Sequence, residues 1–347
     1  MRFFKLLKKM KILKYVVRNS FKDFLPEPGD FELRNEKYPP KLKNGEFLVK
    51  TEYISTDPYM RSFANKRIAP YEQFGFQVGK VIETTNPEYP TTMTVVSHSG
   101  WRDYVVLNGD PDPIFGIKPY DPQIGELPMS LAIGALGMPG MTAYLGLLNI
   151  CQPKSGEVVC VSSAAGAVGS IAGQIAKLKG CVVIGFAGTD EKVRILTEEL
   201  GFDHAFNYKT VKDIKEAILS VSTGIDCYFD NVGGDLSVAV MECMKNNSRV
   251  AVCGSTSSYG NPALMKMPKI PLNVKVQGFS FTQWSWQEQK AAVQQIKEWI
   301  ENGSIKVKES VTNGFEELPN AFIAMLRGDM VGKVVVKVEP SALSIKV

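Results

Sequence analysis

The residues with the clearest chemical use are Ala164, Gly166 and Gly169, which lie in a turn between an apolar run and a helical pattern. The run covers residues 157–162, and apolar residues at steps of three and four then predict a helix that Gly180 ends. Unpaired N–H groups and the helix dipole stabilise negative charge, so this unit can bind the pyrophosphate of a dinucleotide. The simpler alternative is a tight turn that binds no ligand.

The end of the second apolar run bears on which dinucleotide would bind. A carboxylate there typically binds the adenosine ribose of NAD, whereas NADP needs space and a cation for its 2′-phosphate. Gly188 and Thr189 are small and uncharged, and Lys192 follows at the start of the next predicted helix. Asp190 would favour NAD, although an acid at a helix start is also an ordinary partner of the helix dipole. The local residues favour NADP, with a solvent-exposed Lys192 as the alternative.

Tyrosine and arginine side chains are the candidates for catalysis, because hydrogen-bond donors can polarise a carbonyl without a metal. Tyr259 follows the carboxyl end of a predicted strand, where the nicotinamide half of a dinucleotide is expected. Tyr59 and Arg61 lie in a turn after an earlier strand. Tyr259 could instead be a half-buried packing residue, and Arg61 could simply pair with Asp57.

The residue types do not favour a metal site. A catalytic zinc needs three ligands from His, Cys, Asp or Glu. The chain has two histidines, His98 and His204, and its first cysteine is Cys151. We expect His98 to form a hydrogen bond in a loop and His204 to lie at the surface. The six cysteines have no metal-type spacing, which indicates reduced thiols in a cytoplasmic protein.

Length and composition indicate an ordinary globular protein of two domains, since the chain has 347 residues and 44% of them are hydrophobic. A net charge of +4 is too small to indicate nucleic-acid binding. Residues 1–10 are basic and apolar, which is compatible with a weak targeting or membrane-surface segment or with a flexible extension over 1–9. No run is long enough to predict a transmembrane segment.

Two parts of the chain differ in their sequence patterns. Up to about residue 127, short strands separated by prolines and glycines predict a β-rich domain. From residue 129 onward, strands and helices alternate, which predicts a doubly wound parallel sheet with its ligand at the carboxyl ends of the strands. A valine-rich strand near the end of the chain is expected to complete the first domain. The predicted fold class is therefore α/β, with a Rossmann-type sheet plus a β-rich domain.

Several stretches of the chain also resemble one known family. They are residues 56–61, 137–144, 164–170, 174–181, 190–192, 206–209, 226–234 and 332–333. Together they are similar to the prostaglandin reductases, also called leukotriene B4 dehydrogenases or alkenal/one oxidoreductases. These enzymes are zinc-independent members of the medium-chain dehydrogenase/reductase superfamily. The resemblance extends over nearly the whole chain from about Ile12.

The resemblance implies a domain organisation and an assembly. A GroES-like catalytic domain would comprise residues 1–135 and 305–347, and a Rossmann domain would comprise residues 136–304. NADPH would bind between the two domains. Two copies of the chain would pair through their sheet edges as a homodimer.

The resemblance also implies individual cofactor contacts. Lys192 and Tyr208 would hold the 2′-phosphate of NADPH, and Tyr259 is implicated in the reduction. Met330 stands where family members often have Asn, so we expect that contact to be lost or replaced. The other matching positions are Gly166, Ala167, Val168, Gly169, Asn231, Cys253, Gly254, Ser255, Thr256, Ser257, Ser258, Phe279, Ser280 and Phe281.

The predicted reaction is the NADPH-dependent reduction of the carbon–carbon double bond of an α,β-unsaturated ketone or aldehyde. Hydride would add to the β-carbon, Tyr259 and Tyr59 would donate hydrogen bonds to the developing enolate oxygen, and solvent would protonate the α-carbon. One alternative is a zinc-free quinone reductase of the same superfamily, and another is a nucleotide-binding protein without catalysis. The identity of the enone substrate stays open.

Overall fold

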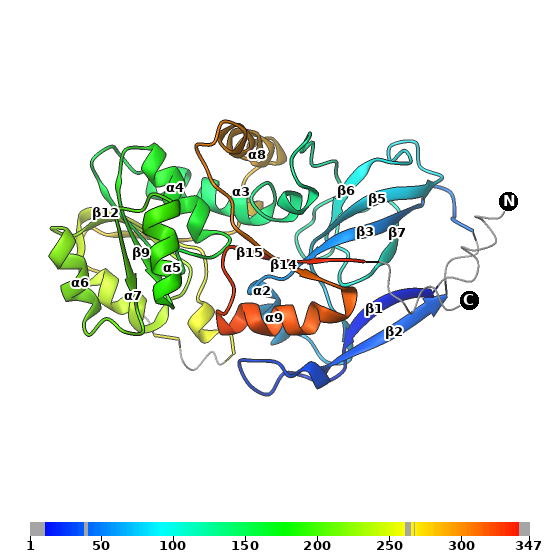
Figure 1. The fold of residues 1–347 in the computed structure, drawn as a ribbon, viewed down its shortest axis with the longest axis horizontal. Coiled ribbons are helices and arrows are strands. Elements are labelled where there is room, and N and C mark those ends of the chain that lie inside the picture. Colours follow the sequence, from blue (N-terminus) through cyan, green and yellow to red (C-terminus); the bar gives the residue numbers. More distant parts are fainter. Residues whose placement is uncertain (1–10, 38–40, 261–264, 267, 340–347) are drawn as a thin grey trace. The chain divides into compact units, whose positions relative to one another are not determined.

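The structure is a computed structural model that describes residues 11–37, 41–260, 265–266 and 268–339. The chain divides into two compact units (Figure 1). The first unit contains residues up to Ile133, the segment Ser310–Asp329 and the chain from Val334 onward. The second contains Gly134–Glu309 and Met330–Lys333. The sequence-based division assigns all of 305–347 to the first domain, whereas the structure places residues 305–309 and 330–333 in the second unit.

The second unit is built on a six-stranded sheet in the order β10-β9-β8-β11-β12-β13, and every neighbouring pair is parallel. The order reverses between β8 and β11, which confirms the predicted doubly wound sheet. The strands are β8 (Val158–Val161), β9 (Val182–Ala187), β10 (His204–Asn207), β11 (Ile225–Asp230), β12 (Met244–Val252) and β13 (Lys275–Gly278).

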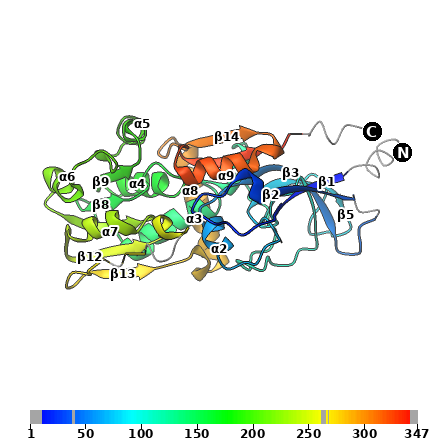
Figure 2. The same ribbon diagram turned by 90° about the horizontal axis from the view of Figure 1, so that it is seen from below.

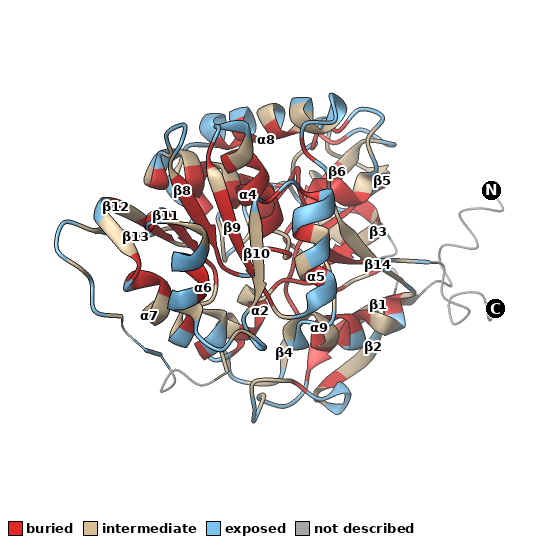
Figure 3. Ribbon diagram, turned by 60° about the vertical axis from the view of Figure 1, so that its left-hand side comes forward, coloured by how far each residue is buried: buried red, intermediate tan, exposed pale blue. Residues whose placement is uncertain are grey.

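Helices pack against this sheet in two groups. Helix α3 contacts both α4 and α8, and α6 contacts α7. The helices of this unit are α3 (Met138–Leu145), α4 (Gly169–Leu178), α5 (Asp190–Arg194), α6 (Ile214–Val221), α7 (Gly234–Met241) and α8 (Trp286–Glu301), with single-turn helices at Gly146–Cys151, Ile195–Glu199, Thr256–Ser258 and Phe281–Gln283. In Figure 3 the central strands β8 and β9 are buried, which explains their unbroken apolar sequences.

The first unit is antiparallel. One sheet has the order β14-β15-β3-β5-β6, with β7 also paired to β3, and a smaller sheet has the order β2-β1-β4. Its strands are β1 (Lys11–Val17), β2 (Phe31–Lys37), β3 (Phe47–Ser55), β4 (Tyr71–Glu72), β5 (Gln77–Thr84), β6 (Thr94–Ser97), β7 (Tyr104–Leu107), β14 (Glu309–Asn313) and β15 (Lys333–Lys337). Its helices are α2 (Tyr59–Ala64) and α9 (Leu318–Arg327), with single turns at Pro28–Asp30, Met129–Ile133 and Phe315–Glu317.

Both ends of the chain contribute to the core of the first unit. The predicted valine-rich strand is β15, which pairs antiparallel with β3. Helix α9 lies beside β1 and β2 (Figure 2), because the ring of Phe322 packs edge-on against Phe31 and the buried Trp101. Aromatic packing of this kind contributes more than the buried area alone. The segments before residue 134 and after residue 309 therefore form one hydrophobic core.

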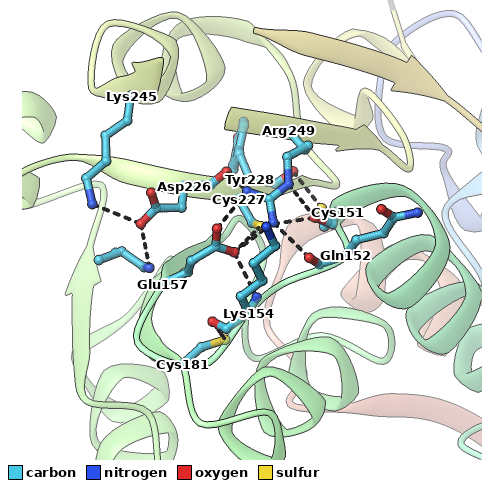
Figure 4. Close-up of polar contacts among 11 residues, drawn as sticks. Cys151, Gln152, Lys154, Glu157, Cys181, Asp226, Cys227, Tyr228, Lys245 and Arg249 are labelled. Atoms are coloured by element: carbon cyan, nitrogen blue, oxygen red, sulfur yellow. Dashed lines mark hydrogen bonds and ion pairs between the residues drawn. The ribbon is translucent and has the colours of Figure 1, made fainter. Parts of the chain in front are cut away.

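A polar network joins the amino ends of the central strands in the second unit (Figure 4). The guanidinium of Arg249 forms a two-pronged ion pair with Glu157, with N–O distances of 3.0 and 2.7 Å, and donates to the Cys151 carbonyl. Burial by itself would raise the pKa of Glu157, but the Arg249 hydrogen bond outweighs it and lowers that pKa. Asp226 accepts hydrogen bonds from Lys245 and from the Val158 N–H. The network connects β8, β11 and β12 at the sheet edge opposite the predicted ligand edge.

Among the described residues, every helix is too short or too polar to cross a lipid bilayer.

Asp103 should make the stability of the first unit depend on pH. Its buried carboxylate accepts the Leu13 N–H at 2.7 Å, and burial raises its pKa to about 7 although that hydrogen bond opposes the shift. In the unfolded chain the group loses its proton near pH ~4. Between these two values only the native state keeps the proton, so stability falls as pH rises.

We therefore expect the pH-dependent loss of stability between pH 5 and pH 8 to be smaller in Asp103→Asn, by about 2 kcal/mol. Urea unfolding followed by tryptophan fluorescence measures this difference. Asp110→Asn, at an exposed position, is the matched control and should behave as the original chain does. An unchanged pH dependence in Asp103→Asn would contradict the assignment.

Candidate active site

The predicted strand, turn and helix are present between β8 and α4. Ser163 adopts a left-handed backbone conformation with φ of 49°, and its carbonyl accepts the Gly166 N–H at 3.0 Å. A Cβ at residue 169 would lie 2.4 Å from the same carbonyl oxygen, so only glycine fits there. Ala164 is fully buried, and its N–H donates to the Phe186 carbonyl in β9. The turn is thus compact and leads directly into the start of a ten-residue helix.

The segment Met330–Lys333 returns to this turn from the far end of the chain. Gly332 pairs with Gly166 in a parallel bridge, and its N–H donates to the Ala165 carbonyl at 2.8 Å. Gly332 has a φ of 67°, and a Cβ there would lie 1.9 Å from the Lys308 carbonyl oxygen. Met330 is two residues from this bridge. The structure therefore brings Gly332 and the chain leading to it against the turn.

The residues expected at the 2′-phosphate end gather beyond the end of β9. A Cβ on Gly188 would lie 3.4 Å from the Tyr208 hydroxyl and from Cε of Lys209. Lys192 lies in α5 and is only 9% exposed, so it is not the solvent-exposed lysine of the alternative interpretation. Lys209 is absent from the sequence-based set, although its position directly after Tyr208 was a usable signal.

The neighbouring acid has a structural role. Asp190 Oδ1 accepts a hydrogen bond of 2.7 Å from the side-chain amide of Asn207. Thr189 caps α5 by accepting the Lys192 N–H. Asp190 thus ties the start of α5 to the end of β10, which weakens the argument that it binds the ribose of NAD.

A buried carboxylate organises the carboxyl ends of β8 and β11. Asp230 Oδ1 accepts hydrogen bonds from Ser162 Oγ at 3.1 Å and from the Tyr228 hydroxyl at 2.8 Å. It also accepts the N–H groups of Val232 and Gly233, at 3.0 and 2.9 Å. Asp230 and Ser162 are missing from the sequence-based set. The available signal was a carboxylate and a hydroxyl, each ending an otherwise apolar strand.

Asn231, a predicted cofactor contact, is also part of this arrangement. Its backbone N–H donates to Ser162 Oγ at 2.8 Å, and its side-chain amide donates to the Ser162 carbonyl at 2.7 Å. The side chain is buried. Asn231 therefore holds the ends of β8 and β11 together, and its amide nitrogen is engaged in that task.

The loop after β12 lies against the end of β11. The N–H groups of Cys253 and Gly254 donate to the Asp230 carbonyl, and that of Ser257 donates to the Val232 carbonyl. The other predicted contacts in this loop are Ser255, Thr256 and Ser258, of which Thr256–Ser258 form a single helical turn. Burial raises the pKa of the Cys253 thiol to about 12, so the thiol is protonated and unreactive at neutral pH.

Tyr259 ends this loop and turns back over it. A Cβ on Gly254 would lie 2.6 Å from the Tyr259 hydroxyl. Burial raises the pKa of Tyr259 to about 12, although a hydrogen bond from the Ser255 backbone opposes the shift. The phenol therefore keeps its proton at neutral pH and can act as a hydrogen-bond donor.

The side chains of residues 279–281 pack within the second unit or cap a turn. The ring of Phe279 packs edge-on against Phe229 and Trp284, and Phe281 is buried. Ser280 caps the following turn by accepting the Thr282 N–H. These side chains are engaged within the unit, so any ligand contact from this segment would come from its backbone, as the resemblance implies.

In the first unit, Tyr59 and His98 lie together. The Tyr59 hydroxyl is 2.9 Å from His98 Nε2, and His98 Nδ1 is 3.2 Å from Asp112 Oδ1. The predicted loop hydrogen bond of His98 is confirmed. His204 in β10 is partly exposed.

Arg61 is buried and bound within the first unit. It is 1% exposed, and each of its three guanidinium nitrogens donates to the chain. Nε and Nη2 bind the carbonyls of Phe24 and Asp23, both at 2.8 Å, and Nη1 binds the Asn65 side chain. Because the guanidinium is buried among these acceptors, it anchors the segment before β2 to α2, and its catalytic role stays a prediction.

Residues 14–112 match a family model described as the N-terminal domain of oxidoreductase, and residues 167–298 match one described as zinc-binding dehydrogenase. Prostaglandin reductase 1 of Rattus norvegicus is 44% identical over 330 residues, covering 93% of this chain and 98% of the relative. The chain belongs to the prostaglandin reductase family.

Other members of the medium-chain dehydrogenase/reductase superfamily are similar over most of their length. The NADPH-dependent curcumin reductase of Escherichia coli is 36% identical, covering 90% of this chain and 93% of that protein. The crystal structure of CurA in complex with NADPH from Vibrio vulnificus has a TM-score of 0.83 at 32% identity, covering 95% and 100% of the two chains. The Escherichia coli quinone oxidoreductase, at 18% identity and a TM-score of 0.75, shares the fold.

The description of one matching family model mentions zinc, which raises the question of whether side chains of this prostaglandin reductase could bind a metal ion. Within the part of the chain that the structure describes, no group of three or more His, Cys, Asp and Glu side chains could hold a metal ion.

Replacing the organising carboxylate should destabilise the second unit. In Asp230→Ala, the buried hydroxyls of Ser162 and Tyr228 and two backbone N–H groups lose their acceptor, so we expect a loss of about 3 kcal/mol in the free energy of unfolding. Urea unfolding followed by circular dichroism measures it. Asp235→Ala is the matched control, because the Asp235 side chain is 80% exposed and pairs with an exposed lysine, and should change stability by less than about 1 kcal/mol. Equal effects of the two changes would refute the assigned role of Asp230.

Proposed function

We propose that this protein catalyses the NADPH-dependent reduction of the carbon–carbon double bond of α,β-unsaturated ketones and aldehydes. The observation that carries the proposal is the 44% identity to prostaglandin reductase 1 over 93% of the chain. Relatives named as an NADPH-dependent curcumin reductase and a 2-alkenal reductase support the same reaction on other enones and enals. The substrate class is therefore a small conjugated carbonyl compound.

The residues present fit a phosphorylated dinucleotide. The Ser163 carbonyl lies where a Cβ at residue 169 would be, so the turn is tight and leads directly into the start of α4, where a pyrophosphate would meet the helix N-terminus. Lys192 would supply the cation for the 2′-phosphate, and Tyr208, whose hydroxyl lies against Gly188 just after β9, would line the same end of the site. Gly166, Ala167 and Val168 complete the turn, and Gly332 holds Met330 next to it. Bound NADPH would supply the hydride.

The chain would contribute stabilisation of the charge that develops on the substrate. After hydride addition to the β-carbon, the carbonyl oxygen carries the negative charge of an enolate, and a preorganised donor lowers the barrier to that state. Tyr259 is our candidate for this donor, because its raised pKa keeps the hydroxyl protonated. Tyr59 is the second candidate, and its hydroxyl lies 2.9 Å from His98 Nε2.

We also propose that the protein is a homodimer of the cytoplasm. Strand β13 is an edge strand whose four residues are all exposed, and Val276 on it and Leu272 before it are 39% and 87% exposed. An uncovered edge with apolar side chains favours pairing with a second copy. All six cysteines are free thiols, which fits a reducing compartment.

Tyr259→Phe should reduce enone turnover by roughly a hundredfold to a thousandfold, because removing one such donor typically has that effect. The loss of NADPH absorbance with a panel of a 2-alkenal, an alkenone and a quinone measures turnover, and NADPH fluorescence measures binding, which we expect to be unchanged. Tyr104→Phe, in the first unit, is the control. Full activity of Tyr259→Phe would remove Tyr259 from the mechanism, whereas turnover of the quinone alone by the original chain would overturn the proposed function.

Lys192→Ala should weaken the binding of NADPH by roughly tenfold to a hundredfold and leave NADH nearly unaffected. Only NADPH loses a charge-assisted contact with its 2′-phosphate. Fluorescence titration with both dinucleotides measures the two dissociation constants, and Lys179→Ala replaces an exposed lysine of the same unit as a control. Equal weakening of both dinucleotides would show that the assigned pocket is wrong.

A further inference from the structure

The carboxyl ends of β9 and β10 lie side by side in the second unit, at the edge where the adenosine end of a dinucleotide is expected. The two strands are parallel neighbours, with Asn207 opposite Ala187, and the Tyr208 N–H donates to the Ala187 carbonyl at 3.1 Å. Gly188 directly follows β9, and Lys209 is the second residue after β10. Both residues therefore lie at the end of the sheet that is expected to bind the ribose of NADPH.

The side chain of Lys209 folds back over this end of the sheet. A Cβ built on Gly188 would lie 3.4 Å from Cε of Lys209 and 3.4 Å from the Tyr208 hydroxyl. Nζ of Lys209 lies 6.0 Å from the centre of the Tyr208 ring, and within the described residues it pairs with no carboxylate. Lys209 is exposed, so its ammonium group lies near Gly188 and is open to an anion.

The turn that carries Lys209 is fixed by the side chain of Asn207. Asn207 Oδ1 accepts the Lys209 N–H at 3.1 Å, and the Asn207 carbonyl accepts the Thr210 N–H at 3.0 Å. The Asn207 amide donates to Asp190 Oδ1 at 2.7 Å. Because Asp190 begins α5, this hydrogen bond ties the turn to the helix that contains Lys192.

The charges at this end of the sheet call for more than one cation. Asp190 and Glu191 are the first two residues of α5, and their negative charges oppose an anion bound nearby. A phosphate monoester carries about two negative charges near neutral pH. Lys192 supplies a single positive charge against this excess, so a second lysine at the same place would make the binding of a phosphate more favourable.

We propose that Lys209 supplies a second positive charge to the 2′-phosphate of NADPH and is a residue that determines the preference for NADPH over NADH. The inference deepens the proposed function and rests on its use of NADPH. Lys192 would bind the phosphate from α5, and Lys209 would bind it from the turn after β10. Both lysines belong to the second unit, so the site is formed within that unit alone.

Variants of Lys209 can separate its charge from its packing. Lys209→Met keeps an aliphatic chain that can cover Gly188 and removes the ammonium group, and Lys209→Gln is a second neutral variant. Lys209→Arg keeps the positive charge. Because salt screens a charge contact at an exposed position, loss of this contact should also make the binding of NADPH less sensitive to salt.

The experiment uses the full chain and measures the dissociation constants of NADPH and NADH by fluorescence titration at low and at high salt. In Lys209→Met and Lys209→Gln we expect the dissociation constant of NADPH to rise roughly threefold to tenfold, since an exposed charged contact contributes less than a buried one. The dissociation constant of NADH should stay the same, and that of NADPH should vary less with salt than in the original chain. Lys209→Arg should bind NADPH as the original chain does.

Lys212→Met, at an exposed position close by in the sequence, is the matched control and should change neither dissociation constant. The inference is overturned if both neutral variants of Lys209 bind NADPH as tightly as the original chain, or if they weaken both dinucleotides equally. An effect of the same size in Lys212→Met also overturns it, because the attraction would then belong to no particular lysine. An original chain that binds NADPH with the expected dependence on Lys209 but oxidises it with no enone would instead refute the proposed function and leave the role of Lys209 standing.

Discussion

Asp230 Oδ1 accepts hydrogen bonds from four groups, two hydroxyls and two backbone N–H groups, at the point where β8 and β11 end. A buried carboxylate is costly unless such partners compensate the lost hydration, so its position fixes the positions of all four donors. Ser162 in turn receives Asn231, and the Asp230 carbonyl receives the loop that begins at Cys253. The arrangement of the predicted cofactor edge in the second unit therefore depends on one buried side chain.

The turn beside this carboxylate is shaped by steric contacts. Residue 169 must lack a side chain because of the Ser163 carbonyl, and residue 332 must lack one because of the Lys308 carbonyl. Residues 330–333 pack with the second unit, and Gly332 therefore meets the turn. The chain from Val334 onward belongs to the first unit. These close backbone contacts make the turn compact at the start of α4, and a helix N-terminus suits a pyrophosphate.

The first unit contributes chemistry of another kind. Its core is aromatic, and the same rings that stabilise it surround His98 and Tyr59. Exclusion of water strengthens the hydrogen bonds inside. Asp112 is held beside His98 by three backbone N–H groups.

Much of the second unit could be predicted from the sequence, because a strand, a glycine turn and a helix are encoded by neighbouring residues. The apolar run before Ala164, the helical spacing up to Gly180 and the small residues after β9 indicate a dinucleotide unit by local rules alone. The absence of metal-type spacing and the resemblance to the prostaglandin reductases were likewise readable, since they depend on residue types and their order.

The tertiary structure decided which distant residues meet. Local patterns contain no information on contacts such as those of Arg61 with Asp23 and Phe24, which make this arginine a buried anchor. The burial of Lys192 depends in the same way on packing that no spacing rule describes. Tyr59, His98 and Asp112 are 39 and 14 residues apart along the chain, by subtraction of their numbers. Only the folding of three loops against one aromatic core makes them neighbours.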